Sequence, residues 1–212
     1  MVNLSGKAGY EEGRWGYDAL MAHRNQEAVR WLRDAVVYQP KSATYWYDLG
    51  FAYQSLGDMP AAATAYRKAA DQGDAKAQFY LGTLYETGTG GLPKDSELAR
   101  SWYGKAASQD GVEALNSVAW AYATSSDPAI RNPVAALECA WKANSLEKDH
   151  PDANHLDILA EAYYINEQHE DAAKTEMQAV ELASPENKAD FQKSLEKYQR
   201  ALESSNRQAI RK

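Results

Sequence analysis

The chain contains a glycine cluster of the kind that can hold a phosphate group. In the stretch "YLGTLYETGTGGLPKD", residues 80–95, three of the four residues 88–91 are glycine. A phosphate-binding loop requires a strand before the glycines and, in its most specific form, a Gly-Lys-Ser/Thr run that opens the next helix. Here a helical pattern precedes the glycines and Leu-Pro-Lys follows them. We therefore interpret the stretch as a hinge between two helices and expect no nucleotide site.

Two histidines and an aspartate form the nearest approach to a metal-binding pattern. His150, His155 and Asp157 lie close together, but their spacing matches no common zinc motif, and His150 precedes Pro151 in an expected loop. The alternative is a loop histidine followed by a histidine at a helix start, and we favour it. We expect no bound metal and no cofactor.

The single cysteine is the remaining candidate for nucleophilic catalysis. Cys139 would need a histidine near it in space to act as a nucleophile. Its neighbours at helical spacing are Ala136 and Ala143, which is typical of a small buried residue. No serine occupies a Gly-x-Ser-x-Gly elbow, and the carboxylates show no distinctive pairing. The sequence predicts no catalytic residues and a protein that is not an enzyme.

Composition and charge narrow the range of partners. The 212 residues are 44% hydrophobic and 25% charged, as in ordinary soluble proteins, and no stretch is apolar for long enough to span a bilayer. The net charge of −7 falls mainly in the second half: residues 1–110 carry 12 Lys and Arg against 13 Asp and Glu, and residues 111–212 carry 11 against 17. Because only the terminal "RQAIRK" is basic, we expect neither nucleic acid nor a membrane as a partner.

The start of the chain bears on its compartment. The residues "MVNLSGKAGY" lack the basic, apolar and small-residue order of a secretory signal. We expect a cytoplasmic protein if residue 1 is the native start, and a periplasmic or secreted one if a leader has been removed. The lone cysteine excludes an internal disulfide and fits either compartment.

Small residues recur at a fixed interval, and this repeat organises the chain. The pairs separated by 34 positions are Gly16 and Gly50, Ala28 and Ala62, and Ala35 and Ala69. Two antiparallel helices approach closely where small residues let ridges meet grooves, while large residues at helical spacing fill the remaining volume. The interval therefore predicts repeated pairs of helices.

The segment "WYDLGFAYQSLGDMPAAATAYRKAAD", residues 46–71, resembles the tetratricopeptide repeat. The matching positions are Trp46, Leu49, Gly50, Tyr53, Gly57, Ala62, Tyr66 and Ala69. In the next unit the gap between corresponding small residues grows from 12 positions to 17, and "GTGGLPKDSELARSWYGKAASQDG" is similar to the long-looped Sel-type relative of that repeat. A fourth unit has the same long gap, and a fifth returns to the short form.

The resemblance covers about residues 8–185 and implies the fold. It implies an all-α, right-handed superhelical solenoid of about five helix-turn-helix repeats, with the first helix of each pair on the concave side. The amphipathic stretch 186–206 is expected to form a C-terminal capping helix. Residues 1–7 and 207–212 are expected to be disordered tails.

Three second helices have a recognisable start. Asp58, Asp95 and Asn132 each place a side-chain acceptor before a helix whose first turn contains a proline or an acid. These residues are predicted to be N-caps.

The resemblance also implies where a partner binds, since the family typically holds extended peptides in the groove lined by the first helices. Carried onto this sequence, the ligand-binding residues are Tyr17, Tyr47, Phe51, Gln54, Phe79, Asn116, Trp120 and Tyr164. Six of these are aromatic, and half-exposed rings would total roughly 450–750 Å² of apolar surface. The Lys, Asn and Arg set with which some members hold a C-terminal carboxylate is absent. We therefore expect an extended apolar or proline-rich segment, with hydrogen bonds from Gln54 and Asn116, and a basic partner residue near Asp157 and Glu161.

Two alternatives remain open. In the first, some of the predicted lining rings are instead packed by neighbouring repeats or covered by the C-terminal helix. In the second, the protein is a self-assembling structural protein, a homo-oligomer that pairs through its terminal helix or convex face.

Overall fold

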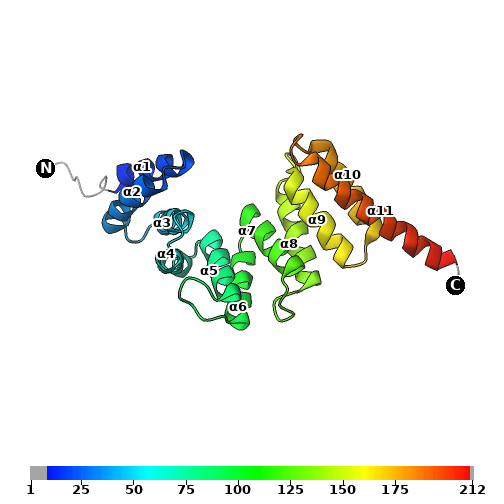
Figure 1. Cartoon of the computed structure of the whole chain (residues 1–212), viewed down its shortest axis with the longest axis horizontal. Coiled ribbons are helices and arrows are strands. Elements are labelled where there is room, and N and C mark those ends of the chain that lie inside the picture. Colours follow the sequence, from blue (N-terminus) through cyan, green and yellow to red (C-terminus); the bar gives the residue numbers. More distant parts are fainter. Residues whose placement is uncertain (1–8, 211–212) are drawn as a thin grey trace. The chain divides into compact units, whose positions relative to one another are not determined.

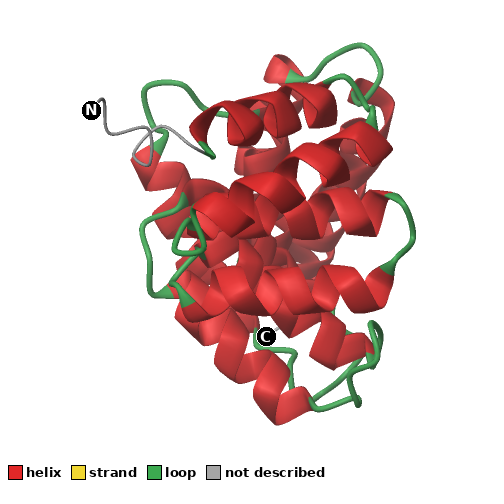
Figure 2. Cartoon of the chain, turned by 90° about the vertical axis from the view of Figure 1, so that its left-hand side faces the viewer, coloured by secondary structure: helices red, strands yellow, loops and turns green. Residues whose placement is uncertain are grey.

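A computed structural model describes residues 9–210, and every regular element in that range is an α-helix (Figure 1; Figure 2). The all-α prediction is confirmed. The predicted N-terminal tail, residues 1–7, lies outside the described residues, as do residues 211 and 212.

The helices group into two compact units, Met1–Ser108 and Gln109–Lys212. The described helices of the first unit are α1 Tyr10–Met21, α2 Asn25–Tyr38, α3 Ala43–Ser55, α4 Met59–Asp71, α5 Ala75–Thr87 and α6 Ser96–Ala107. Those of the second are α7 Val112–Thr124, α8 Pro133–Leu146, α9 Ala153–Ile165, α10 His169–Leu182 and α11 Lys188–Ile210. Neighbouring helices pack most extensively as consecutive pairs, from α1 with α2 to α9 with α10. These pairs coincide with the repeats read from the sequence.

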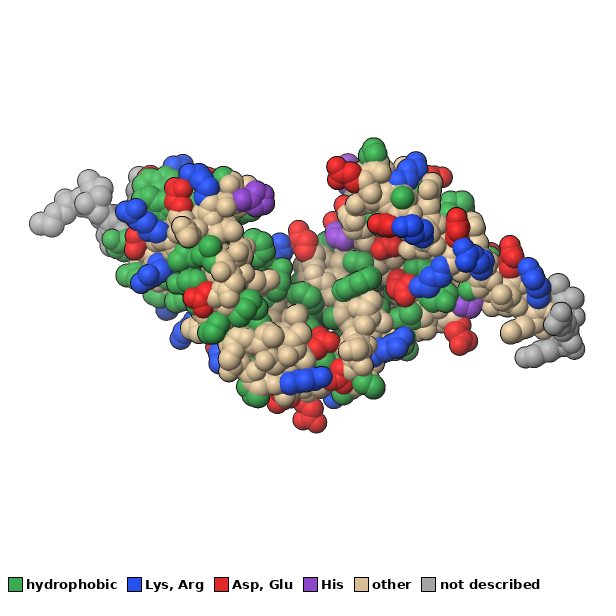
Figure 3. Space-filling view, in the orientation of Figure 1, with side chains coloured by type: hydrophobic (Ala, Val, Ile, Leu, Met, Phe, Trp, Pro, Cys, Tyr) green, Lys and Arg blue, Asp and Glu red, His purple; other side chains and the backbone are tan. Residues whose placement is uncertain are grey.

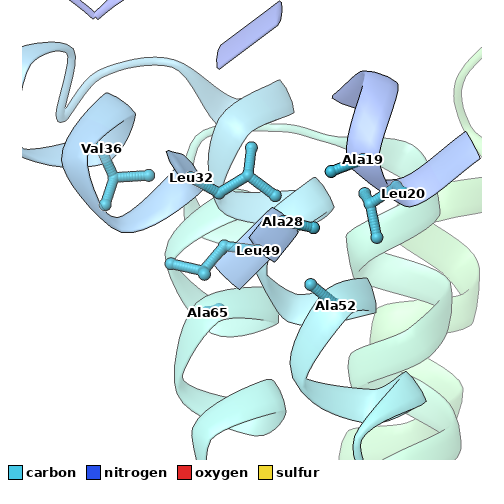
Figure 4. Packing of buried hydrophobic residues seen from close by; sticks show 8 residues of the cluster. All are labelled: Ala19, Leu20, Ala28, Leu32, Val36, Leu49, Ala52 and Ala65. Atoms are coloured by element: carbon cyan, nitrogen blue, oxygen red, sulfur yellow. The ribbon is translucent and has the colours of Figure 1, made fainter. Parts of the chain in front are cut away.

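Alanine and leucine side chains hold the first pairs together. One buried cluster draws on four successive helices (Figure 4), and its members are Ala19, Leu20, Ala28, Leu32, Val36, Leu49, Ala52 and Ala65. The alanines allow the helix axes to approach, and the leucines fill the space between them. The recurring small residues therefore mark helix crossings, as predicted.

Glycine at two crossings faces a buried tyrosine. A Cβ atom at Gly82 of α5 would lie 2.7 Å from Cε1 of Tyr103 and 3.2 Å from the carbonyl oxygen of Ala99, both on α6. The same relation recurs one pair earlier, where a Cβ at Gly50 would lie 2.7 Å from Cδ1 of Tyr66. The tyrosine ring thus occupies the volume that a side chain would need.

This contact makes Gly82→Ala destabilising. We expect it to lower the free energy of unfolding by about 1–3 kcal/mol, because the methyl group overpacks a site bounded by a buried ring and backbone. Gly104 of α6 is a matched control, since a Cβ there would meet no atom within 4 Å. Gly104→Ala should stabilise the protein by about 0.5–1 kcal/mol through helix propensity. Thermal unfolding followed by circular dichroism measures both, and shifts of the same sign would contradict this account of the crossing.

The three predicted N-caps are confirmed. Each side chain accepts a hydrogen bond from the backbone N–H three residues later, at 3.2 Å for Asp58, 2.9 Å for Asp95 and 3.1 Å for Asn132. The glycine cluster lies between α5 and α6, where Gly88 ends α5 in the left-handed conformation with φ of 69°. The backbone N–H of Asp95 donates to the carbonyl of Tyr85 at 2.9 Å and so ties the end of this loop to α5. The stretch is a hinge between helices, as predicted.

The last helix extends beyond the predicted range. α11 runs from Lys188 to Ile210, so residues 207–210 are helical where a tail was expected. Ion pairs one helical turn apart support this end of the helix, Arg200 with Glu196 at 2.8 Å and Arg207 with Glu203 at 3.0 Å. Charged side chains of both signs cover its exposed side (Figure 3). Its buried side carries Phe191 and Tyr198, which pack in apolar clusters with residues of α9 and α10.

Candidate functional site

The structure distributes the predicted ligand-binding residues over both units. Those of the first unit lie on α1, α3 and α5 and are Tyr17, Tyr47, Phe51, Gln54 and Phe79. Those of the second lie on α7 and α9 and are Asn116, Trp120 and Tyr164. All stand on the first helix of a pair.

Three tyrosines of the first unit form one aromatic cluster. The rings of Tyr66 and Tyr80 stack with centroids 5.0 Å apart and planes 7° from parallel, and Tyr47 lies 6.0 Å from each. Tyr66 is fully buried, whereas Tyr47 and Tyr80 are partly exposed. Offset and tilted ring contacts of this kind stabilise packing beyond the area that they bury. The cluster therefore presents a fixed aromatic surface.

Phe79 extends this cluster toward α6. Its ring centroid lies 5.5 Å from that of Tyr80 and 5.5 Å from that of Tyr103. The hydroxyl of Tyr103 donates to Glu86 at 2.6 Å. Gln54 makes a comparable bond, since its Oε1 accepts from the hydroxyl of Tyr66 at 2.8 Å. The polar groups at the edge of the cluster therefore fix the rings in place.

The other two residues of the first unit differ in exposure. The side chain of Tyr17 is exposed, and that of Phe51 is partly buried against the cluster of Figure 4. We had left open that neighbouring repeats pack some of the predicted lining rings. Tyr47, Phe51 and Phe79 are partly packed in this way, and Tyr17 is the least packed of the four.

A buried aspartate lies next to the aromatic cluster. Burial raises the pKa of Asp48 to about 6, and the neighbouring carboxylate of Asp74 adds to this rise, while Lys76 opposes it. The pKa of the Tyr47 hydroxyl is also raised, first by burial and then by Tyr80. The Tyr47 hydroxyl is therefore neutral at physiological pH.

In the second unit, Asn116 and Trp120 stand one turn apart on α7. Trp120 is exposed, but Asn116 is only 2% exposed, and neither polar atom of its amide has a hydrogen-bond partner among the described residues. A ligand cannot reach this amide unless the groups around it move. We had expected Asn116 to line an open surface, and that expectation was wrong. An unpaired buried amide costs about 1–3 kcal/mol.

Tyr164 is packed against the C-terminal helix instead of lining an open surface. Its ring centroid lies 5.0 Å from that of Tyr198, and the ammonium of Lys197 lies 4.2 Å from the same ring. Lys197 and Tyr198 also donate to Glu161, each at 2.8 Å. The basic residue that we expected a partner to supply is thus supplied by α11 itself. Sequence reasoning missed this because the side chains of α11 that contact α9 are 36 and 37 positions away from Glu161 and leave no local pattern.

A pair of carboxyl groups, one buried and one half-buried, lies close to this contact. Glu176 of α10 is fully buried, and the side chain that faces it is Asp157 of α9. Neither oxygen of Glu176 accepts from a hydrogen-bond donor in the described part of the chain, so the pair is stable only if the two carboxyls share a proton. Burial, followed by the charge of Asp157, raises the pKa of Glu176 to about 8. The signal in the sequence was an acid at helical spacing between Ala172 and Ala179.

The groups considered for catalysis or metal binding have other surroundings. Nδ1 of His155 lies 2.6 Å from Oε2 of Glu147, across the turn before α9. Cys139 is buried, and burial raises the pKa of its thiol to about 11, so the reactive thiolate is disfavoured. Within residues 9–210 no three His, Cys, Asp or Glu side chains gather as metal ligands would. None of the described helices is long and apolar enough to cross a membrane.

Comparison with known proteins assigns the repeats. A family model for the Sel1 repeat matches residues 45–74, 75–111 and 112–146. Residues 45–146 are therefore three Sel1 repeats, in a chain whose fold is that of Sel1 and tetratricopeptide repeat proteins. Such repeats form scaffolds for protein–protein interaction and are generally non-catalytic. Residues 46–71, which we likened to the tetratricopeptide form because of their short gap, lie within the first segment that the Sel1 model matches.

Solved structures of Sel1 and tetratricopeptide proteins share the solenoid fold. A Sel1 repeat protein from Oxalobacter formigenes is 25% identical, with a TM-score of 0.62 over 87% of this chain and 72% of its own. The antigen c5321 of uropathogenic Escherichia coli is 21% identical, with a TM-score of 0.64 over 81% of this chain and 38% of its own. YrrB, a tetratricopeptide protein with an unusual peptide-binding site, is 17% identical, with a TM-score of 0.55 over 87% of this chain and 91% of its own. A comparison with curated protein sequences gives no match.

Proposed function

We propose that this repeat protein is a non-enzymatic interaction module that binds an extended apolar or proline-rich segment of a partner protein. The binding surface is the aromatic face of the first unit, formed by residues of α1, α3 and α5. Tyr17, Tyr47 and Phe79 contact the ligand, and Phe51 and Gln54 border it.

The observation that carries this proposal is the aromatic cluster. Tyr47, Tyr66 and Tyr80 are held by mutual ring contacts, and hydrogen bonds to Gln54 and Glu86 fix rings at its edge. A rigid aromatic surface loses little conformational entropy when a ligand stacks on it. Proline and other apolar side chains of an extended segment suit such flat surfaces, and an extended proline-rich segment is itself already ordered.

In the second unit, taken by itself, Trp120 is exposed and available to an apolar group, whereas Asn116 must first become accessible. Tyr164, Glu161 and Asp157 have their contacts within the unit, so we place no ligand on them. The peptide-binding site of YrrB, a protein of the same fold, is consistent with a peptide ligand here.

The test is binding of fluorescent peptides to the full chain, measured by anisotropy over an array of apolar and proline-rich sequences. Tyr17→Ala is expected to weaken binding of the tightest peptide about tenfold, as for a truncated aromatic contact of roughly 1.4 kcal/mol. Tyr17 is exposed, so the substitution spares the core. Trp141→Ala on α8, a second helix of the other unit, is the control and should leave the affinity unchanged. An unchanged affinity in Tyr17→Ala, or no binding peptide in the array, contradicts the proposal.

A further inference from the structure

An apolar pocket of about 420 Å³ opens in the first unit between α2 and α4, the second helices of successive pairs. Val36 and Val37 of α2 and Trp46, Leu49 and Tyr53 of α3 contribute to its lining, together with residues of α4. None of the residues that we assign to peptide binding lines this pocket, and the aromatic cluster of Tyr47, Tyr66 and Tyr80 is not part of it.

One ring of the pocket is held in place, and part of its edge is apolar. The indole N–H of Trp46 donates to the carbonyl of Pro40 at 2.9 Å, which holds the ring in position. Val37, which lines the pocket, is 75% exposed. An exposed apolar side chain beside a preformed apolar pocket is typical of an interaction surface.

Positive charge borders the same pocket. Arg33 lines it and also lines a second hollow of about 510 Å³ along α2, which shares Val37 and adds Arg30. Neither arginine forms an ion pair with a residue that the structure describes, although Asp34 lies in the second hollow. A partner that fits must therefore bring a bulky apolar group with a carboxylate about one turn away.

The chain itself carries such a segment on α8 of the second unit. Val134 is 62% exposed and Trp141 60% exposed, and Glu138 is exposed between them. Their spacing of four and three residues places them on one helical face. Lys142 does not compete for Glu138, because it pairs with Asp110 at 2.7 Å. The second half of the chain also holds most of the negative charge, so its surface suits the arginines of α2.

We propose that α8 of one copy docks on the α2–α4 pocket of a second copy, with Trp141 in the pocket and Glu138 paired with Arg33. The partner is thus another molecule of the same chain. One buried Trp removes roughly 150–250 Å² from water, well below the roughly 1,200–2,000 Å² of a stable interface. The contact is therefore weak and sensitive to salt, and it strengthens if two copies make it reciprocally.

Sedimentation velocity of the full chain, from low to high micromolar concentration, tests this association. We expect a concentration-dependent dimer or chain of copies, and Trp141→Ala and Val37→Asp should each weaken it at least tenfold. Met177→Ala, which removes an exposed side chain from α10, is the control and should leave it unchanged. A monomer at every concentration overturns the proposal, as does association that both variants retain.

Charge reversal provides a second, independent readout. Arg33→Glu and Glu138→Lys should each reduce association alone. A mixture of the two variants should recover it, because the carboxylate introduced on α2 of one copy then meets the ammonium introduced on α8 of the other. Failure of the mixture to recover overturns the assigned pairing. Peptide affinity is measured separately as a control for the fold. Trp141→Ala should lose self-association and keep its peptide affinity. Loss of both would show damage to the fold and overturn the assignment of Trp141 to the contact.

Discussion

Glu176→Gln is expected to raise the thermal midpoint of unfolding by several degrees at pH 8.5 and to leave it nearly unchanged at pH 5. The folded protein holds a proton on Glu176 up to about pH 8, whereas the unfolded chain releases it near the ordinary value of 4.5. The folded state therefore binds more protons across this window, and stability falls as the pH rises from about 4.5 to about 8. Glutamine carries no charge at any of these pH values and donates to Asp157, so the penalty disappears.

Thermal melts of both proteins at several pH values measure this difference. Glu181→Gln, which changes an exposed acid of the same helix, is the matched control and should behave as the natural chain does. Glu161, whose charge acts on both carboxyls of the pair, binds Lys197 and Tyr198, so α11 lies close to the pair. A midpoint difference that is constant from pH 5 to pH 8.5 would show that no shared proton links Glu176 to Asp157.

The second large effect is the loss of stability in Tyr66→Ala. Tyr66 is fully buried, fills the volume left by Gly50 and stacks on Tyr80. Its removal leaves a cavity, and truncation of a buried aromatic ring costs about 3–5 kcal/mol. Because Tyr47 and Tyr80 then lose their common neighbour, peptide affinity should fall together with stability.

Tyr66→Phe separates the ring from its hydroxyl. It keeps the packing and removes only the bond to Gln54, so it should cost about 1 kcal/mol and keep most of the peptide affinity. Urea unfolding measures the stability of both variants, and anisotropy measures binding. Equal losses in the two variants would mean that the hydroxyl, and not the ring, holds the cluster together.

The sequence was sufficient for the fold because the helix pairs depend on local patterns. Gly82 and Tyr103 repeat, one pair later, the contact of Gly50 with Tyr66, and the same crossing geometry underlies both. The cap at Asp58 also depends only on neighbouring residues. Such features repeat from pair to pair, and the repeat makes them visible in a single chain.

The candidate site was harder to predict from the sequence than the fold, because it depends on contacts between segments that are far apart in the chain. Tyr164 was expected to be open, and its ring instead packs against Lys197 and Tyr198 of α11. Asn116 occupies the expected helical position but is buried. The spacing between Ala172 and Ala179 places Glu176 on the buried side of its helix, but its partner is 19 positions away on another helix, and no local pattern indicates that partner. Helical position could thus be predicted, but accessibility could not.

Hydrogen–deuterium exchange of the full chain, with and without the tightest peptide of the array, tests the central claim most directly. A peptide on the aromatic face should slow exchange in α1, α3 and α5 and leave α8 to α11 unchanged. Protection confined to the second unit, or none at saturating peptide, would contradict the account.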